Sequence, residues 1–267
     1  MKPIQILLII ALLVQNLCAP VSAAAPESAS SDEQVMKVAF AEDYPPFSWR
    51  PKDGSVQGIL RDLLAELLES RLGVPVEYFI YPWASAQLLV EEGKMDAFFS
   101  IPTPARGLYT ETTQHPLFVS DYYLYTGIEN PNIALLKTVH SLEELKRLTD
   151  IRHVAMFGAG WHGTNLAGVT YIETVQDSRH IPKLLQFNRA DVYLEQRPLM
   201  DYQIKALGYS GKILEIPNSM AATHWHLMIS KLSHFKSVLP KLDALIASME
   251  ERGEYQKIQE RVFEHYR

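Results

Sequence analysis

Residues 35–40 read VMKVAF, residues 58–73 read GILRDLLAELLESRLG, and residues 76–80 read VEYFI. The middle segment carries leucines at helical spacing on one face, and it ends at Gly73, where a helix C-terminus favours positive φ. The flanking segments are short and apolar, as buried strands are. A strand, a helix and a second strand in this order predict a parallel pair joined by a helical crossover.

Strands and helices keep alternating outward from this segment. A predicted helix over residues 83–92 and a strand over 97–100 complete a β-α-β-α-β order, which favours a mostly parallel sheet covered by helices. A similar series follows residue 127, and two amphipathic helices separated at Gly253 end the chain. The predicted strands of this second series cover residues 153–157, 170–172, 190–194, 213–216 and 224–230, and its helices cover residues 141–148, 181–187 and 198–207.

The first residues form a separate segment. Lys2 precedes an apolar run over residues 4–14, and small residues at 21–25 resemble the cleavage site of a secretory signal peptide. We therefore expect a signal peptide over residues 1–25 and a flexible leader over 26–33. No other apolar run approaches the roughly 18 residues of a membrane span, so the processed protein is expected to be soluble.

Charge and cysteine content exclude several classes of protein. The formal net charge is −6, which disfavours nucleic-acid binding because such binding rewards clustered Lys and Arg. The single cysteine, Cys18, lies inside the predicted signal peptide, and Asn16 and Leu17 precede it where a lipoprotein site needs small residues. We therefore expect no lipid anchor, no disulfide and no thiolate metal site in the processed chain.

Three positions at predicted strand ends are candidates for a binding site. The aromatic pair in Tyr44-Pro-Pro-Phe47 follows the first strand, where open α/β sheets bind ligands, although the same residues also suit a rigid turn. Arg106 follows the third strand and could hold a carboxylate, although most arginines are solvated. The Gly158-Ala-Gly160 turn could present N–H groups to an anion or be a plain turn.

Two further observations disfavour a metal site and a hydrolase. His224 and His226 share one face of a predicted strand, but no carboxylate or cysteine stands beside them, so a structural role is favoured over a metal site. The sequence has no G-x-S-x-G motif, which disfavours a serine hydrolase. We expect no cofactor.

The order of short motifs along the chain is distinctive. It runs through Tyr44-Pro-Pro-Phe, Asp53-Gly54, Gly58, the leucine helix, Pro82-Trp83, Gly93-Lys-Met-Asp96-Ala97, Thr103-Pro-x-Arg106, Pro116-Leu-Phe118, Asn188-Arg-Ala-Asp191 and Gly253-Glu-Tyr255-Gln-Lys-Ile258. This set resembles the bacterial extracellular solute-binding proteins of family 3, the polar amino-acid-type periplasmic binding proteins. The resemblance covers the whole mature chain and is strongest over residues 37–120.

The resemblance implies an α/β, two-lobed periplasmic binding protein fold of type II. Each lobe would be a mostly parallel sheet with flanking helices, and two hinge strands would join the lobes. The first lobe would comprise residues 34–123 and 227–267, and the second lobe residues 124–226. Hinge closure, of the Venus-flytrap kind, would bury a ligand in the cleft between them.

The resemblance also implies roles for individual residues. Tyr44 and Trp83 match the family's aromatic residues that flank the ligand, and Arg106 matches the arginine that clamps its carboxylate. The loop through Gly160 and Trp161 matches the second lobe's contribution. The complete set of expected ligand-binding residues is Tyr44, Trp83, Ser100, Thr103, Arg106, Gly160, Trp161, Glu195 and Gln196.

The sequence departs from the family pattern where the ligand ammonium would bind. The family's amino-acid binders carry an aspartate at the place of Gln196, and Glu195 stands one residue earlier. Strand alternation points these two side chains to opposite faces, so only one is expected to face the cleft. Ile101 replaces a small hydroxyl residue, with Ser100 beside it. A less cationic or more aromatic solute than an α-amino acid therefore stays open.

Three functions follow from the resemblance. The first is a monomeric periplasmic binding protein without catalysis, which captures a small polar, carboxylate-bearing solute for the membrane permease of an ABC transporter. The second is an enzyme similar to periplasmic cyclohexadienyl dehydratases, with Glu195 as general acid. The third is the ligand-binding component of a sensory system. Turnover of prephenate or arogenate would distinguish the enzyme from the other two.

Overall fold

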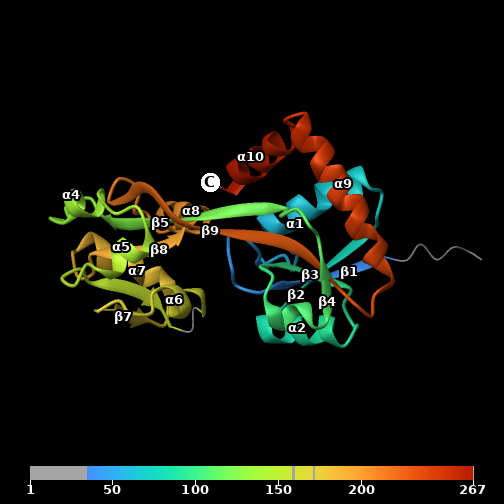
Figure 1. The fold of residues 1–267 in the computed structure, drawn as a ribbon, viewed down its shortest axis with the longest axis horizontal. Coiled ribbons are helices and arrows are strands. Elements are labelled where there is room, and N and C mark those ends of the chain that lie inside the picture. The colour runs from blue at the N-terminus through green and yellow to red at the C-terminus, as the bar shows by residue number, and fades with distance from the viewer. Residues whose placement is uncertain (1–34, 158–159, 171, 267) are drawn as a thin grey trace, which may run out of the picture. The chain divides into compact units, whose positions relative to one another are not determined.

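The computed structural model describes residues 35–157, 160–170 and 172–266. The predicted signal peptide, the leader and Cys18 lie outside these residues, as do residues 158–159 of the predicted glycine turn. Strands and helices alternate along the described chain (Figure 1).

The first group of elements builds a sheet around β1 (Met36–Ala41). β1 pairs in parallel with β2 (Val76–Tyr81) on one side and with β3 (Ala97–Ser100) on the other. The antiparallel strand β9 (Ile213–Ser230) lies beside β3, and β4 (Thr110–Thr112) pairs with β9. The helical elements of this group are α1 (Ile59–Leu64), the π-helical η1 (Ala65–Arg71), α2 (Trp83–Glu91), α3 (Pro104–Gly107), the 3₁₀ turn η3 (His234–Ser237), α9 (Val238–Glu251) and α10 (Glu254–Tyr266).

The second group repeats this plan with other strands. β5 (Phe118–Gly127) pairs antiparallel with β8 (Val192–Gln196). β8 lies parallel to β6 (His153–Met156), which pairs in parallel with β7 (Ile172–Val175). The helical elements of this group are α4 (Ile133–Leu136), α5 (Leu142–Lys146), α6 (Gly160–Asn165), the 3₁₀ turn η2 (Ser178–His180), α7 (Ile181–Gln186) and α8 (Arg197–Ala206).

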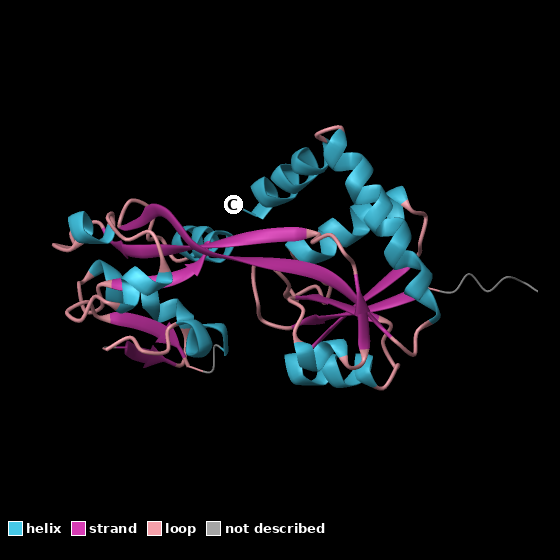
Figure 2. Ribbon diagram, viewed as in Figure 1, coloured by secondary structure: helices cyan, strands magenta, loops and turns pink. Residues whose placement is uncertain are grey.

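Two long strands connect the groups. β5 and β9 pair antiparallel from Phe118 opposite Trp225 to Gly127 opposite Ile213, and they run side by side in Figure 2. The strand order is therefore β2-β1-β3-β9-β5-β8-β6-β7, with β4 added to β9. This arrangement confirms the expected two-lobed fold with two crossing strands. The exact lobe boundaries stay a prediction, and both fall within these strands.

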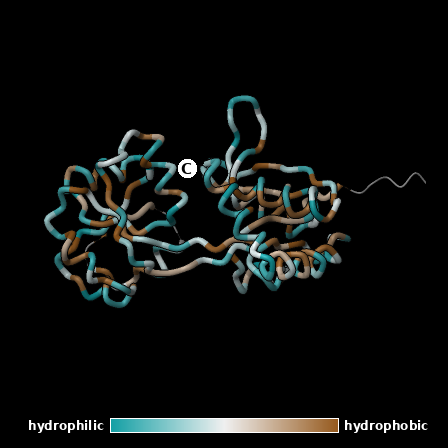
Figure 3. Tube along the Cα trace, turned by 90° about the horizontal axis from the view of Figure 1, so that it is seen from above, coloured by the Kyte–Doolittle hydropathy of each residue, from teal (hydrophilic) through white to brown (hydrophobic). Residues whose placement is uncertain are grey.

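Each group encloses its own apolar core, and Figure 3 shows hydrophobic segments in both. In the first core, the leucines of α1 and η1 pack with the last two helices, so residues as distant as Leu63 and Val262 belong to one cluster. In the second core, Leu145 and Leu166 cover one face of the sheet, and Leu185 covers the other. The predicted leucine face is confirmed, with Leu60, Leu63, Leu64, Leu67 and Leu68 all buried.

Some predicted elements have different bounds in the structure. The strands expected over 213–216 and 224–230 are parts of the single 18-residue strand β9, because the segment between them also pairs with β5. The strand expected over 190–194 begins two residues later, at Val192. The Asp191 N–H donates to the Arg152 carbonyl (2.8 Å), so this residue belongs to the preceding turn. The strand expected over 170–172 is found at Ile172–Val175.

Candidate functional site

Arg106 lies just beyond the end of β3, and neutral groups hold its guanidinium. Its Nε donates to Gln87 Oε1 (3.0 Å), and its Nη1 donates to Ser100 Oγ (3.2 Å) and to the Ile101 carbonyl. The guanidinium carbon lies 5.0 Å from the centroid of the Trp83 ring, a cation–π distance. These contacts fix the side chain without compensating its charge.

The charge of Arg106 has no carboxylate partner among the described residues. Burial lowers the pKa of Arg106, and the only group that acts in the opposite direction is the phenol of Tyr109. An arginine still keeps its proton at neutral pH. A partly buried positive charge of this kind suits a carboxylate, which can accept two parallel hydrogen bonds from the guanidinium.

The backbone around Arg106 is also fixed. The Thr103 hydroxyl accepts a hydrogen bond from the Arg106 N–H (3.3 Å) and thereby caps α3, with Pro104 at the first helical position. Trp83 begins α2 and packs edge-on against Phe98, with ring centroids 5.4 Å apart. Residues from three segments therefore hold one arginine and one tryptophan in a defined geometry.

Tyr44 lies in a tight loop after β1. The loop closes through hydrogen bonds between the backbones of Tyr44 and Ser48, and the Ser48 hydroxyl donates to the Ala41 carbonyl (2.6 Å). Gly58 precedes α1 with φ +134°, and a Cβ there would lie 2.1 Å from the Phe47 carbonyl oxygen. Only glycine fits this approach, so the leucine helix and the Tyr44 loop are locked together.

A second cluster joins Tyr44 to β5 and β8. The Gln196 Nε2 donates to the Tyr122 hydroxyl (3.2 Å) and lies 3.5 Å from the Tyr44 hydroxyl. Trp161 stacks on Tyr122, with ring centroids 3.7 Å apart and planes at 6°. The Gln196 Oε1 is buried and has no hydrogen-bond partner among the described residues. A buried acceptor without a partner is costly, so this oxygen is a candidate contact for a ligand donor.

Glu195 is buried beside this cluster and is bound by other groups. Its carboxylate accepts hydrogen bonds from the Tyr193 hydroxyl (2.6 Å) and from the Gln196 N–H (2.8 Å). Burial raises the pKa of the Glu195 carboxyl, whereas His162 and the two hydrogen bonds lower it. Burial raises the pKa of Tyr44 and of Tyr122, and the nearby Glu195 carboxyl raises both further. Glu195 and Gln196 both lie near these phenols, and only Gln196 bonds to them.

The predicted site residues thus fall into two clusters. Trp83, Ser100, Thr103 and Arg106 form the first, and Tyr44, Trp161, Glu195 and Gln196 form the second. No hydrogen bond or ring contact within the described ranges joins the two clusters directly. Gly160 begins α6, which brings Trp161 to the second cluster.

Sequence reasoning missed three residues of the second cluster. Tyr122 lies on a predicted hinge strand, His162 directly follows Trp161, and Tyr193 lies two residues before Glu195 on the same face. For Tyr193 the available signal was its spacing from Glu195, because residues two apart on a strand share a face.

The two strand histidines have separate environments. His226 is buried, and its Nδ1 lies 3.2 Å from the Thr113 hydroxyl, whereas His224 is exposed. Within the described ranges, no three His, Cys, Asp or Glu side chains are grouped to hold a metal ion. In that same part of the chain, no helix has the length and apolarity of a transmembrane segment.

The sequence profile of the bacterial extracellular solute-binding proteins, family 3, matches residues 36–265. The chain belongs to this family. The match spans both groups of elements and includes every predicted ligand-binding residue. A search of the curated proteins finds no significant match.

Solved structures of solute-binding proteins share the fold at low sequence identity. One is an ancestral cationic amino acid solute-binding protein, with a TM-score of 0.65 and 21% identity over 86% of this chain and 95% of the other. Another, from Wolinella succinogenes, is assigned as the binding component of an ABC transporter and is complexed with lysine (TM-score 0.65, 21% identity, 85% and 95% coverage). A third is substrate-binding domain 2 of Lactococcus lactis GlnP in an open conformation (TM-score 0.62, 18% identity, 86% and 95% coverage).

Proposed function

We propose that this family 3 protein captures a small, carboxylate-bearing polar solute in the periplasm and delivers it to the permease of an ABC transporter. The observation that carries the proposal is the fixed guanidinium of Arg106, which is partly buried and bound only by neutral groups. A solute carboxylate would supply the missing negative charge.

In this proposal, each of the two clusters contacts one end of the solute. The carboxylate end would lie against Arg106 and Trp83, and the other end would lie against Tyr44, Trp161 and Gln196. Hinge closure about β5 and β9 would bring the clusters onto one ligand, as in other two-lobed proteins. Ser100 and Thr103 already bind Arg106, so their role in this proposal is to position the guanidinium.

The second cluster favours a solute whose distal end is apolar or weakly cationic. Its groups are mainly aromatic rings and a neutral amide, and its one carboxylate is already bound by the Tyr193 hydroxyl and the Gln196 N–H. The similar proteins include one named as a cationic amino acid binder and one complexed with lysine, so amino acids are the first solutes to test.

The test is direct. The purified protein is denatured, and the small molecules that it releases are identified by mass spectrometry. The identified solute is then titrated into refolded protein by isothermal calorimetry. We expect a carboxylate-bearing compound that binds with one-to-one stoichiometry. Recovery of a solute without an acidic group, which binds equally well to Arg106→Ala, would contradict the proposal.

Glu195 supports a second candidate, a dehydratase on the same fold. The specific observation is a buried carboxyl whose pKa is raised by burial, as a general acid at neutral pH requires. Incubation with prephenate or arogenate tests this candidate. Turnover that is lost in Glu195→Gln would establish the enzyme, and absence of turnover at high protein concentration would leave binding as the function.

A further inference from the structure

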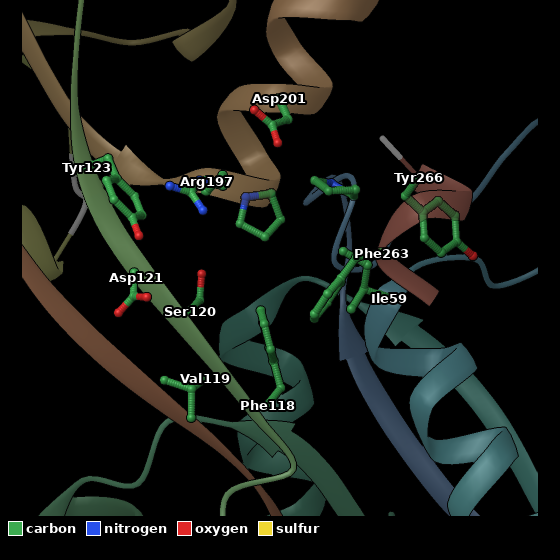
Figure 4. Close-up of a pocket in the computed structure, with 12 residues that line it drawn as sticks. Ile59, Phe118, Val119, Ser120, Asp121, Tyr123, Arg197, Asp201, Phe263 and Tyr266 are labelled. Atoms are coloured by element: carbon green, nitrogen blue, oxygen red, sulfur yellow. The ribbon is translucent and has the colours of Figure 1, made fainter. Parts of the chain in front are cut away.

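A pocket of about 190 Å³ lies beside β5, separate from the nine predicted ligand-binding residues (Figure 4). Its apolar wall is formed by Ile59 at the start of α1, Phe118 on β5 and Phe263 on α10. Its polar wall is formed by side chains of β5 and of the first turn of α8. The volume is below the roughly 300–1,000 Å³ of typical drug-sized sites, so it suits a small compound.

The pocket and the candidate solute site use different residues of β5. Tyr123 lines the pocket, whereas Tyr122 lies against Trp161 and Gln196. None of the predicted ligand-binding residues lines the pocket. Two separate ligand sites can therefore exist on this chain.

Among the described residues that line the pocket, the one cation is compensated by other groups of the protein. Arg197 binds Glu215 through two hydrogen bonds (2.9 and 2.7 Å), and its guanidinium carbon lies 4.0 Å from the centroid of the Tyr123 ring. The Asp121 carboxylate, which also lines the pocket, forms no ion pair with a described residue. Its negative charge is therefore available to a cationic ligand at the polar wall.

A buried hydroxyl also lacks a partner in this pocket. Ser120 is 2% exposed, and its Oγ has no hydrogen-bond partner among the described residues. Figure 4 shows this oxygen pointing into the space between Arg197 and Phe263. Buried polar atoms in native proteins are nearly always hydrogen-bonded, so the hydroxyl indicates a polar occupant.

We propose that this pocket is a second ligand site, which takes a small organic cation with a compact apolar or aromatic body. The Asp121 carboxylate faces the cationic nitrogen, and the Ser120 hydroxyl accepts a hydrogen bond from it. The body lies against Ile59, Phe118 and Phe263. This inference does not depend on the function proposed above, because it uses other residues.

The test compares three probes of similar size and different charge: benzylamine, benzyl alcohol and benzoate. Each is titrated at pH 7 into ¹⁵N-labelled protein, and the amide signals of Ser120, Asp121 and Tyr123 are followed. We expect saturable shifts with benzylamine, at least threefold weaker binding of benzyl alcohol, and the weakest binding with benzoate. Equal binding of the three probes, or no saturable shift at these amides, would overturn the proposal.

Substitutions of pocket residues test whether benzylamine binds in this pocket. Asp121→Asn should weaken benzylamine about 3- to 10-fold, and the matched control Glu173→Gln, an exposed charge on β7, should leave it unchanged. Ser120→Ala should also weaken it and should fold, because the hydroxyl bonds to no described residue. Unchanged affinity in both pocket variants would overturn the proposal.

A third variant separates the two sites. Trp83→Ala alters the candidate solute site and should leave benzylamine binding unchanged. If Trp83→Ala removes the benzylamine shifts, the probe binds at the solute site and the second site does not exist. Loss of solute binding in Trp83→Ala with intact benzylamine shifts would support both proposals independently.

Discussion

Arg106 and Arg152 are two partly buried arginines with opposite surroundings. Arg152, just before β6, binds the Asp191 carboxylate through Nε (2.8 Å) and Nη2 (2.9 Å), and its Nη2 also donates to the Asn188 carbonyl (2.6 Å). The oxygens to which Arg106 donates within the described ranges are all neutral. A described carboxylate therefore neutralises the charge of Arg152 but not that of Arg106.

The difference separates a structural arginine from one that is a candidate for ligand binding. Arg152 directly precedes β6, whereas Arg106 lies in α3 after β3. Asp191 stabilises the fold by pairing, because an unpaired buried carboxylate would be costly. At Arg106 the described residues position the side chain but supply no counter-charge, which is why we propose that a ligand carboxylate pairs with it.

The largest expected effect is on solute binding. Arg106→Ala should weaken binding of the solute by about 30-fold to several thousand-fold, because truncating one partner of a desolvated charge pair costs about 2–5 kcal/mol. Arg106→Lys should recover part of this loss, since lysine cannot form the two-pronged contact. Isothermal calorimetry measures both.

Arg179→Ala is the matched control for this change. Arg179 is exposed and pairs with Asp177, so its loss removes the same charge elsewhere and should leave affinity unchanged. A loss below about threefold in Arg106→Ala, with the fold intact, would show that the carboxylate binds elsewhere.

Arg152→Ala should lower the stability of the protein and leave its solute affinity nearly unchanged. The free energy of unfolding should fall by about 3 kcal/mol, at the lower end for a broken buried pair because the Arg152 side chain is 40% exposed. Solute affinity should stay within about twofold, since Arg152 belongs to neither cluster of the site. Urea unfolding measures the first quantity and calorimetry the second. Unchanged stability would mean that the other partners of Asp191 suffice.

The second lobe should also lose stability in acid because of His153. Burial lowers the pKa of this imidazole to about 4, although the Asp191 carboxylate acts to raise it. The pKa of a histidine in the unfolded chain is about 6.5. The unfolded chain therefore binds a proton that the native chain does not, and stability falls as pH drops from 6.5 to 4. The loss is at most about 3 kcal/mol. His153→Leu should flatten this part of the pH profile, and an unchanged slope would refute the assignment.

The smallest expected effect concerns Ser100. Ser100→Ala removes one acceptor from the Arg106 guanidinium and should weaken solute binding by about fivefold, the value of an ordinary hydrogen bond. In the Arg106→Ala background the same change should have no further effect, because its only role is to position that side chain. Additive losses would instead show that Ser100 binds the solute itself.

The sequence predicted features that depend on local order and missed those that depend on distant contacts. The strand Ala97–Ser100 and the buried leucines follow from periodicity, which is a property of neighbouring residues. The continuity of β9 past Pro217 and Asn218 has no local signal, because these two residues lie at a register shift and the pairing of Ile216 and Ser219 with β5 maintains the strand on either side. The stacking of Trp161 on Tyr122 likewise requires two segments that only the tertiary fold brings together.

The candidate site likewise contains residues that the sequence predicts and contacts that it does not. Arg106 could be named in advance from its place beyond the third strand and from the family resemblance, whereas Trp83 was named from the resemblance alone. That Thr103 and Ser100 would bind Arg106 could not be foreseen, since a hydroxyl after a strand can contact a ligand, cap a helix or bind another side chain.

The first core contains residues from both ends of the described chain, and this arrangement imposes an order on folding. Leu63 and Leu64 pack in the same cluster as Leu242, Ile246 and Val262, which are made much later than the two leucines. The second core is encoded by the continuous middle of the chain and can form earlier, whereas the first must wait for α9 and α10. Until α9 and α10 have been made, the leucine face of α1 lacks the helices that cover it in the native core.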